Sequence, residues 1–407
     1  TGLCRARFRS CPDASDGNAD FRKGRWQTVS QTADIIIIGG GIVGCAAAYY
    51  LAKSGTKRVI VLEATKSIGH GGSCRNGGGV RQSGRDVREL PYAMYGIQHF
   101  WPTLSEELGV DVEYTQKGNL RLGKTEAHLK KLQTLTDNAQ SVGLGVEMVD
   151  AAEVQELCPY LSKDIIGASW CPTDGHANPL TTTLGYYKRA LELGVQFFTD
   201  APVAMLRKIR GKVRQIVLQD GTVLEAEQIL LAAGYESRAI ARSVGVDLPM
   251  TRLIDEMFVT EMEPHMFDIM LGTADADFYG HQAHHGSFVF GSECGYEEVT
   301  DMDDPSKLYT NSMTLSASCR AVMGYIPQLA EAKVVRSWCG WLDNAFDDVP
   351  FIGNCPDAEG LTVACGFTGH GFGTAPVVGY MLSQILHGEP TVVDISALAP
   401  NRFMPNK

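Results

Sequence analysis

Hydrophobic residues near the start of the chain occur in the order strand, turn, helix, strand. Ile35 to Ile38 is an apolar run that is too short for a helix and has the length of a buried strand. Residues 46–53 have the composition of a helix, and Ser54-Gly55 predicts its end. The apolar run Arg58 to Leu62 predicts a second strand, which ends on Glu63. The pattern therefore predicts one strand–helix–strand unit.

The turn of this unit reads Gly39-Gly40-Gly41-Ile42-Val43-Gly44, which fits G-x-G-x-x-G. Gly39 permits a tight turn, Gly41 lets the backbone approach a pyrophosphate, and Gly44 lets the helix pack closely on the strand. The helix N-terminus offers N–H groups and a partial positive charge to phosphates. Glu63 follows Gly44 by 19 residues, where a carboxylate can accept hydrogen bonds from a ribose. Together these features predict a dinucleotide site.

An alternative interpretation is a membrane span, because residues 35–52 form an 18-residue stretch without a charge. Four glycines, two tyrosines and the immediate second strand argue against it.

A second glycine-rich stretch covers residues 67–83 and excludes a long regular element. A flexible linker is one interpretation. Arg75, Asn76 and Arg81 among the glycines favour another, in which the backbone presses against a flat ligand and its amides act as donors.

Downstream periodicity predicts both helices and strands. The predicted helices are 86–109 (interrupted by Pro91 and Pro102), 125–142, 151–157 (capped by Asp150), 180–193, 305–323 and 371–386. The predicted strands are a hairpin over 112–123 with its turn at 117–119, then 165–170, 195–198, a meander of 203–209, 213–219 and 222–226, a buried strand at 228–232, and 253–261, 277–281, 287–292, 333–341, 349–353 and 361–364.

Composition is that of a soluble globular protein, with 44% hydrophobic and 20% charged residues in 407. This length allows two domains or one interwoven domain.

The net charge of −11 and the absence of a basic tract argue against nucleic acid or an anionic membrane as a partner, and no transmembrane segment is predicted. Eleven scattered cysteines without C-x-x-C indicate a reducing cytoplasm.

The first 31 residues are polar, contain five arginines and lack the apolar core of a secretory signal. We expect a flexible arm, a tag-like extension or a segment that packs on a partner. Cys4 and Cys11 are too few for an iron–sulfur cluster. The acidic residues between 297 and 304 predict a solvated loop.

Several motifs together resemble FAD-dependent oxidoreductases of the D-amino-acid oxidase, glycine oxidase and sarcosine oxidase type. Besides the first glycine turn and Glu63, the resemblance rests on Ser73-x-Arg75-Asn76-x-Gly78, Asp174-Gly175-x-x-x-Pro179, Leu231 to Gly234, Asp347 to Gly353 and Gly366 to Phe372. It implies an α/β (α+β) fold in which a Rossmann-like FAD-binding domain is interleaved with a mainly antiparallel β-sheet substrate domain.

The resemblance implies non-covalent FAD and a set of residues that hold it. These are Gly39, Gly41, Ile42, Val43, Gly44, Glu63 and Ala64 for the ADP half; Gly72, Ser73, Arg75, Asn76, Gly77 and Gly78 along the pyrophosphate and flavin; Val203, Ala233 and Gly234 near adenine and diphosphate; and Gly340, Ile352, Gly369, His370, Gly371, Phe372 and Gly373 around the flavin. A helix N-terminus aimed at flavin N1 and O2 suits the negative charge that develops there.

Residues 75–89, with Leu90-Pro91, also resemble the FAD-bearing β subunits of heteromeric opine, proline and hydroxyproline dehydrogenases. This implies partner subunits that carry an iron–sulfur cluster or a second flavin, FMN. The expected organisation is an N-terminal extension (1–33), FAD-binding parts at 34–110, 176–249 and 336–390, substrate parts at 111–175 and 250–335, and a tail (391–407).

Two departures from the family pattern concern the substrate. Leu342 stands where simple oxidases carry an arginine that clamps the substrate carboxylate, and Gly373 stands where sarcosine oxidases carry a lysine. Cys339 lies one residue out of register with the flavin-linking cysteine of monomeric sarcosine oxidases, so a buried cysteine is the alternative to a covalent link.

The candidates that line the site are Arg75, Arg81, Glu256, Tyr279, His281, His284, His285 and His370. His370 is preferred because its motif fixes its location, and Arg81 is preferred for carboxylate binding. Tyrosines and histidines on a sheet are more often structural. His284-His285 lacks a third ligand for a metal, so no metal site is predicted.

Three functions follow. The first is a flavin dehydrogenase that oxidises the C–N bond of an amino acid or N-substituted amino acid to an imine, as the catalytic subunit of a complex. The second is a self-contained oxidase that reduces oxygen to peroxide. The third is a nicotinamide enzyme or a non-catalytic nucleotide-binding subunit, against which residues 366–373 argue.

Overall fold

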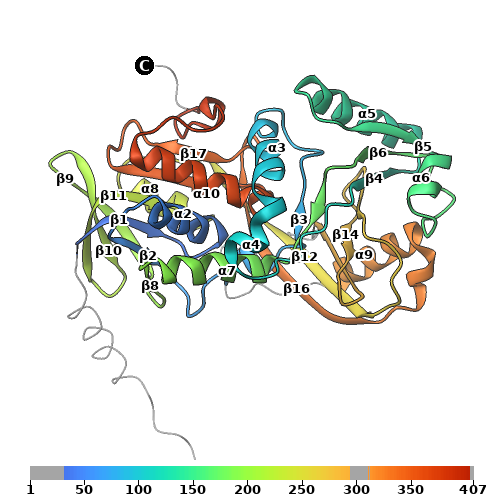
Figure 1. The fold of residues 1–407 in the computed structure, drawn as a ribbon, viewed down its shortest axis with the longest axis horizontal. Coiled ribbons are helices and arrows are strands. Elements are labelled where there is room, and N and C mark those ends of the chain that lie inside the picture. The colour runs from blue at the N-terminus through green and yellow to red at the C-terminus, as the bar shows by residue number, and fades with distance from the viewer. Residues whose placement is uncertain (1–31, 294–309, 311, 404–407) are drawn as a thin grey trace, which may run out of the picture.

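The computed structural model describes residues 32–293, 310 and 312–403, which form two large sheets with helices packed on them (Figure 1). The predicted fold class is confirmed, since a mainly parallel nucleotide-type sheet is interleaved along the chain with a mainly antiparallel one. Residues 1–31, 294–309, 311 and 404–407 lie outside the described residues. Most of the predicted extension, Cys4, Cys11, the acidic loop and the start of the predicted helix 305–323 therefore lie outside them too.

The first sheet has the order β17-β18-β11-β1-β2-β8, and β10 and β9 continue from β11 as a meander. Its strands are β1 (Thr32–Ile38), β2 (Val59–Leu62), β8 (Gln196–Phe198), β9 (Val203–Ile209), β10 (Lys212–Leu218), β11 (Val223–Leu231), β17 (Phe351–Asn354) and β18 (Leu361–Cys365). β1 lies in the centre, parallel to both β2 and β11, because its four isoleucines are buried from both sides.

Helices cover both faces of the first sheet. α2 (Ile42–Lys53) packs between α7 (Pro179–Glu192) and α10 (Gly371–His387) on the face of Ile35 and Ile37, whereas α8 (Glu236–Arg242) shares the opposite core with Ile36 and Ile38 (Figure 1). α3 (Leu90–His99) packs against α10, and α4 (Leu104–Leu108) follows it. Short 3-10 helices occur at Gly72–Cys74, Trp101–Thr103, Pro327–Glu331 and Ser396–Leu398.

The second sheet has the order β16-β12-β15-β14-β13-β4-β6-β5. Its strands are β4 (Asn119–Gly123), β5 (Glu147–Asp150), β6 (Gly167–Cys171), β12 (Met250–Met262), β13 (Met270–Thr273), β14 (Tyr279–Gln282), β15 (Ser287–Glu293) and β16 (Val334–Ala345). Phenylalanines 258, 278, 288 and 290 form a core with α9 (Ser312–Tyr325) on one face. α5 (Glu126–Ser141) and α6 (Ala151–Leu157) lie at the β5 end (Figure 1).

A two-stranded sheet connects the halves: β3 (Gly79–Val80), from the second glycine-rich stretch, pairs with β7 (Gly175–His176). The cap predicted at Asp150 is confirmed, because its carboxylate accepts from the N–H groups of Ala152 and Glu153 in a capping box.

The predicted hairpin over 112–123 is wrong. β4 is a strand, but its neighbours are β13 and β6, and Thr115 forms only an isolated bridge with His176. Gly118 donates its N–H to the carbonyl of Asp174, so distant contacts replace the predicted turn.

Other element boundaries differ from the predictions. Residues 222–226 and 228–232 are one strand, β11, and β13 was not predicted. Pro91 lies in the first turn of α3, where its missing N–H costs nothing, so it begins this helix instead of interrupting it. The predicted domain boundary at 336 falls inside β16, whose partner is β12 of the second sheet.

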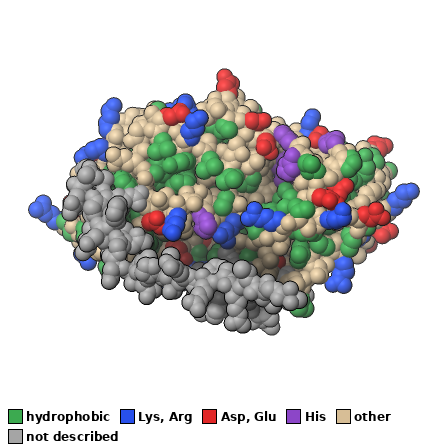
Figure 2. Space-filling model, turned by 90° about the horizontal axis from the view of Figure 1, so that it is seen from below, with side chains coloured by type: hydrophobic (Ala, Val, Ile, Leu, Met, Phe, Trp, Pro, Cys, Tyr) green, Lys and Arg blue, Asp and Glu red, His purple; other side chains and the backbone are tan. Residues whose placement is uncertain are grey.

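The membrane-span interpretation of residues 35–52 is wrong, since they form a strand, a turn and part of α2. Within the described residues, no helix is long and apolar enough to cross a bilayer. Figure 2 shows one side of the molecule, on which acidic and basic side chains are interspersed.

Candidate cofactor and substrate site

The first glycine turn lies where β1 ends against β11. A Cβ at Gly39 would lie 2.2 Å from the carbonyl oxygen of Ala232, and Gly39 has a φ of 112°. A Cβ at Gly44 would lie 2.0 Å from the carbonyl oxygen of Gly39. Both positions require glycine, since each contact would be with rigid backbone.

The two glycine-rich stretches meet at the N-terminus of α2. Gly41 precedes this helix and provides no side-chain cap, and the N–H of Ile42 donates to Ser73 Oγ at 2.9 Å. A Cβ at Gly41 would lie 3.0 Å from the same hydroxyl. Val43 is buried in the first turn of α2. The N-terminus of α2 and the missing side chain of Gly41 form a cradle of the kind that suits a pyrophosphate, with the Ser73 hydroxyl at its edge.

Glu63 ends β2 beside this cradle. Its carboxylate accepts from the N–H of Gly40 at 2.9 Å and, through its other oxygen, from the N–H and hydroxyl of Thr65. The backbone of Ala64 follows it, and the N–H of Ala201, two residues before Val203, donates to the carbonyl of Glu63. Ala233 and Gly234 follow β11, next to the end of β1. The predicted ADP-binding residues therefore lie at one edge of the first sheet.

The second stretch joins this edge to the second sheet. Asn76 holds its turn by donating to the carbonyl of Ser73 and accepting from the N–H of Gly78. Arg75 donates to the carbonyl of Cys339 in β16, and the Trp338 indole donates back to the carbonyl of Arg75. These contacts anchor the loop on β16.

Glycines allow the loop at 72–78 and the second sheet to approach each other closely. A Cβ at Gly77 would meet Met257 and Tyr279, and one at Gly78 would meet the carbonyl of Ala177. A Cβ at Gly340 would meet Arg75, whereas one at Gly72 would lie 3.6 Å from the carbonyl of Trp341.

His370 precedes the first residue of α10, without a capping hydrogen bond from its side chain, and lies against a buried ionic cluster. Its Nδ1 is 3.1 Å from Glu89 Oε1, and Glu89 also accepts from Arg85 at 3.3 Å and from the Tyr92 hydroxyl at 2.9 Å. Arg85 further donates to the carbonyl of His370. Residues of the loop before α3 therefore fix both the ring and the carbonyl of His370.

The residues around His370 complete the end of α10. Gly369 has a φ of 76°, and Leu342 lies over it. The Trp101 indole donates to the carbonyl of Gly373 and packs on the Phe372 ring. Ile352, also predicted near the flavin, is buried in β17 and lines a groove with Ile385 and Glu389 at the opposite end of α10.

The protonation state of this cluster follows from its surroundings. Burial raises the pKa of Glu89, but His370, Arg85 and Tyr92 outweigh it and bring this pKa below its usual value. Burial lowers the pKa of His370 despite Glu89, so the imidazole is neutral at pH 7. Because an ionised carboxylate only accepts, Nδ1 carries the proton, and Nε2 is left as an acceptor.

Glu89, Arg85 and Tyr92 were not among the predicted site residues. We expect Glu89→Gln to lower the free energy of unfolding by about 3 kcal/mol, because Arg85 would keep a buried charge without its counter-ion. Denaturant unfolding measures this. Glu107→Gln, which breaks an exposed pair with Lys53, is the control and should cost below about 1 kcal/mol. Equal losses in both variants would contradict the prediction.

One face of the second sheet looks toward the glycine-rich loop, and we call it the site face. It carries Asp255, Met257 and Tyr279, because side chains alternate along a strand and the register places Met257 and Tyr279 on either side of Gly291. The Tyr279 hydroxyl donates to Asp255 at 2.6 Å. The Arg81 guanidinium lies over the Tyr279 ring, 5.9 Å from its centre. Two predicted candidates, Arg81 and Tyr279, therefore lie together.

Glu256 does not belong to this group. It pairs with Ser292 and Cys339 on the opposite face, where Ser292 bonds to Ser318 of α9. The prediction of Glu256 as a catalytic residue is therefore wrong, because alternation turns its neighbour Asp255 toward the site instead. Cys339 lies on that same far face and is buried, which agrees with a structural cysteine.

His281 is on the site face but forms a buried stack. Its ring lies 3.8 Å from that of His176, nearly parallel, and His176 bonds through Nε2 to the carbonyl of Asp268. Burial lowers the pKa of His281 well below its usual value and that of His176 to about 4. His284 and His285 lie at the surface, and His284 contacts the Thr115 hydroxyl. No metal-binding group of three or more ligands occurs among residues 32–293 and 312–403.

The stack makes stability depend on pH. Because the folded pKa of His176 is below the unfolded value, the unfolded chain binds more protons between pH 6.5 and 4, so stability is complete above 6.5 and falls with acid. The loss from His176 is about 3 kcal/mol by pH 4. His176→Phe keeps a ring in the stack and should remove this pH-dependent part of the free energy of unfolding, which denaturation curves from pH 4 to 7 measure. His99→Phe, at an exposed position, should leave the pH dependence unchanged. Identical pH profiles for the wild type and His176→Phe would contradict it.

Comparison with known proteins gives one family and many relatives. The DAO family model, FAD dependent oxidoreductase, matches residues 34–385. Mitochondrial dimethylglycine dehydrogenase of Rattus norvegicus is 28% identical over 389 residues, which cover 91% of this chain and 45% of that protein. The chain thus spans about half the length of the dimethylglycine dehydrogenases it matches.

Two further relatives match over most of their length. Sarcosine oxidase subunit beta of Arthrobacter sp is 26% identical over 360 residues, 87% of this chain and 86% of that protein. Among solved structures, L-proline dehydrogenase from P. horikoshii has a TM-score of 0.83 and 25% identity, over 92% of this chain and 98% of that one.

Proposed function

Since this chain belongs to the DAO family of FAD dependent oxidoreductases, we propose that it oxidises the C–N bond of an amino acid or N-substituted amino acid to an imine. The opine, proline or hydroxyproline type is the proposed substrate class. The observation that carries this is the position of Arg81, a cation on the side of the second sheet that faces the glycine-rich loop. Family membership sets aside the nicotinamide alternative.

The residues present fit FAD. Gly41 leaves the backbone at the start of α2 accessible to a pyrophosphate, while Gly39 and Gly44 let the strand, turn and helix pack closely. Glu63, 19 residues after Gly44, supplies the carboxylate for the ribose. The loop at 72–78 and the N-terminus of α10 would hold the flavin half. When bound, FAD accepts a hydride from the carbon next to the nitrogen, and water then hydrolyses the imine.

The protein's own groups would bind and orient the substrate. Arg81 holds the carboxylate, and the Tyr279 ring supports the guanidinium from below. Glu89 fixes the proton of His370 on Nδ1, so Nε2 is an acceptor for a proton from the substrate nitrogen. Met257 and Tyr279 pack against Gly77 and exclude water from the contact between the glycine-rich loop and the second sheet.

We propose in addition that the chain acts as the FAD-bearing subunit of a heteromeric dehydrogenase. The relative named sarcosine oxidase subunit beta, matched along most of its length, supports a subunit role. Partners with FMN or an iron–sulfur cluster, and a cytoplasmic location, belong to the same proposal.

The first experiment is a visible spectrum of the purified chain before and after acid precipitation. We expect flavin bands that move to the supernatant as FAD. Anaerobic mixing with proline, hydroxyproline, opines and sarcosine should then bleach the flavin with at least one of them. A reduced chain that passes electrons to a dye and not to oxygen supports the dehydrogenase, and peroxide formation supports the self-contained oxidase. No bleaching by any amino acid would refute the proposed function.

A further inference from the structure

A second arginine, Arg121, lies on the site face beside Tyr279. The register aligns Gly291, Tyr279, Gly272, Arg121 and Ser169 in one row across β15, β14, β13, β4 and β6. Aligned residues on neighbouring strands share a face, so Arg121 points to the same side as Tyr279. Only Gly272, which has no side chain, separates them.

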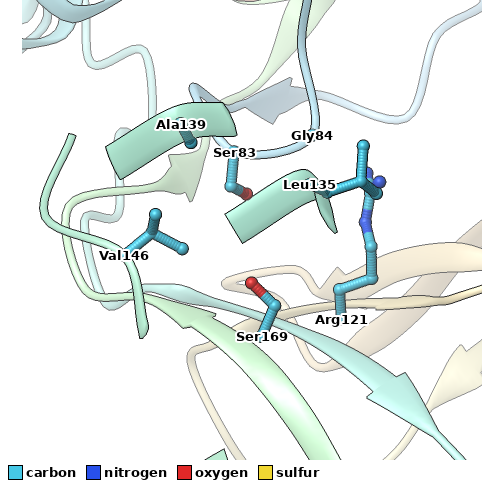
Figure 3. A pocket seen from close by; sticks show the side chains of 7 residues that line it. All are labelled: Ser83, Gly84, Arg121, Leu135, Ala139, Val146 and Ser169. Atoms are coloured by element: carbon cyan, nitrogen blue, oxygen red, sulfur yellow. The ribbon is translucent and has the colours of Figure 1, made fainter. Parts of the chain in front are cut away.

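No side chain covers the row at Gly272, and a Cβ built there would meet its neighbours only at ordinary contact distance. The nearest atoms to a Cβ built there are the carbonyl oxygen of Phe278 and Cβ of Tyr279, both at 4.0 Å. On the far side, the Arg121 guanidinium lies against Gly84, where a Cβ would be 2.4 Å from its nitrogen. Figure 3 shows Arg121 extending from its strand toward Gly84 and Leu135, at the edge of a small cavity. The contact with Gly84 therefore places the Arg121 guanidinium next to the loop that carries Arg81.

The buried carboxylate of Asp174 lies near enough to stabilise the charges of both Arg81 and Arg121, but it forms no ion pair with either. No hydrogen bond or ion pair forms between the Arg81 or Arg121 side chain and residues 32–293 or 312–403. The nearby carboxylates are engaged: Asp174 accepts from the N–H groups of Gln82 and Ser83, and Asp255 accepts from Tyr279. Burial, followed by the charge of Arg81, lowers the pKa of Arg121 to about 10. The two positive charges therefore repel each other, Asp174 offsets part of that repulsion, and an anion bound near both arginines would offset more of it.

We propose that Arg81 and Arg121 form a two-anion site and that the substrate carries two carboxylates, as an N-carboxyalkyl amino acid does. This rests on the proposed function. Arg81 takes the carboxylate shared with ordinary amino acids, and Arg121, on the other side of Gly272, takes the one on the N-substituent. A substrate with one carboxylate makes no contact with Arg121 and therefore lacks the binding energy of that second pair.

Sarcosine and iminodiacetate form a matched pair of probes, because they differ only by a carboxylate on the N-substituent. With the FAD-loaded chain, we expect kcat/KM for iminodiacetate to exceed that for sarcosine at least 10-fold. Arg121→Gln should lower the value for iminodiacetate about 10- to 100-fold and leave that for sarcosine within about twofold. Arg207→Gln, an exposed arginine on β9, is the matched control and should change neither.

Unreactive ligands give a readout apart from turnover. Malonate should perturb the flavin spectrum at a concentration at least 10-fold lower than acetate does, and Arg121→Gln should abolish the difference. Arg121→Lys, which keeps the charge, should retain part of it even if Arg121→Gln does not fold.

The outcomes separate the two proposals. Turnover of sarcosine or proline without any preference for dicarboxylates overturns the two-anion site alone. An equal effect of Arg121→Gln on both substrates also overturns it, since both arginines would then hold one carboxylate. A flavin that no amino acid reduces refutes the proposed function, whereas malonate preference in such a chain still supports the two-anion site.

Discussion

Gly44→Ala is expected to yield a chain that no longer retains FAD. The new Cβ would lie 2.0 Å from the carbonyl oxygen of Gly39, which is rigid backbone at the end of β1. Because α2 cannot move away without leaving α10 and α7, the turn itself must open. The measurement is the ratio of flavin to protein absorbance after purification, which should fall to near zero.

A second variant separates loss of the cofactor from loss of the fold. A Cβ at Gly41 would meet only the hydroxyl of Ser73, so Gly41→Val should fold but block the pyrophosphate and raise the FAD dissociation constant about 100-fold or more. Gly145→Ala is the control, because nothing lies within 4 Å of its Cβ. Normal flavin content in Gly44→Ala would place the cofactor away from this turn.

The cradle was predictable because its signals are local. An apolar run, a fixed glycine spacing and an acid 19 residues later all lie within about 30 residues, and each constrains the backbone directly. The end of α10 was predictable for the same reason. Caps such as Asp150 depend on side chains three residues apart.

Pairings between distant segments were not predictable. Glu89 contacts His370 across 281 residues, and nothing near either one signals the other. Asp255 and Glu256 are adjacent acids, and only the register of β12 with β15 and β16 decides which of them faces the site. Arg121 was missed because its meaning depends on β13, a four-residue strand that the pattern did not predict. The fold class therefore follows from sequence, whereas the substrate side of the site depends on sheet register.

Arg81→Met is expected to lower kcat/KM for every substrate of the chain about 100- to 1,000-fold, because a bidentate, charge-assisted pair with the carboxylate is lost. Most of the loss should appear in KM if Arg81 binds ground and transition states equally. The flavin spectrum should stay unchanged, since none of the contacts that form the cradle involves the Arg81 side chain.

Two comparisons make this prediction specific. Arg81→Lys keeps the charge but not the planar fork, so its activity should lie between that of the wild type and that of Arg81→Met. Arg207→Met, on the exposed part of β9, should behave as wild type. A loss confined to iminodiacetate, with sarcosine unaffected, would assign Arg81 to the second carboxylate and leave the common carboxylate to another residue. Arg81 and Arg121 therefore have opposite expected signatures: one loss is general, and the other is selective for the dicarboxylate.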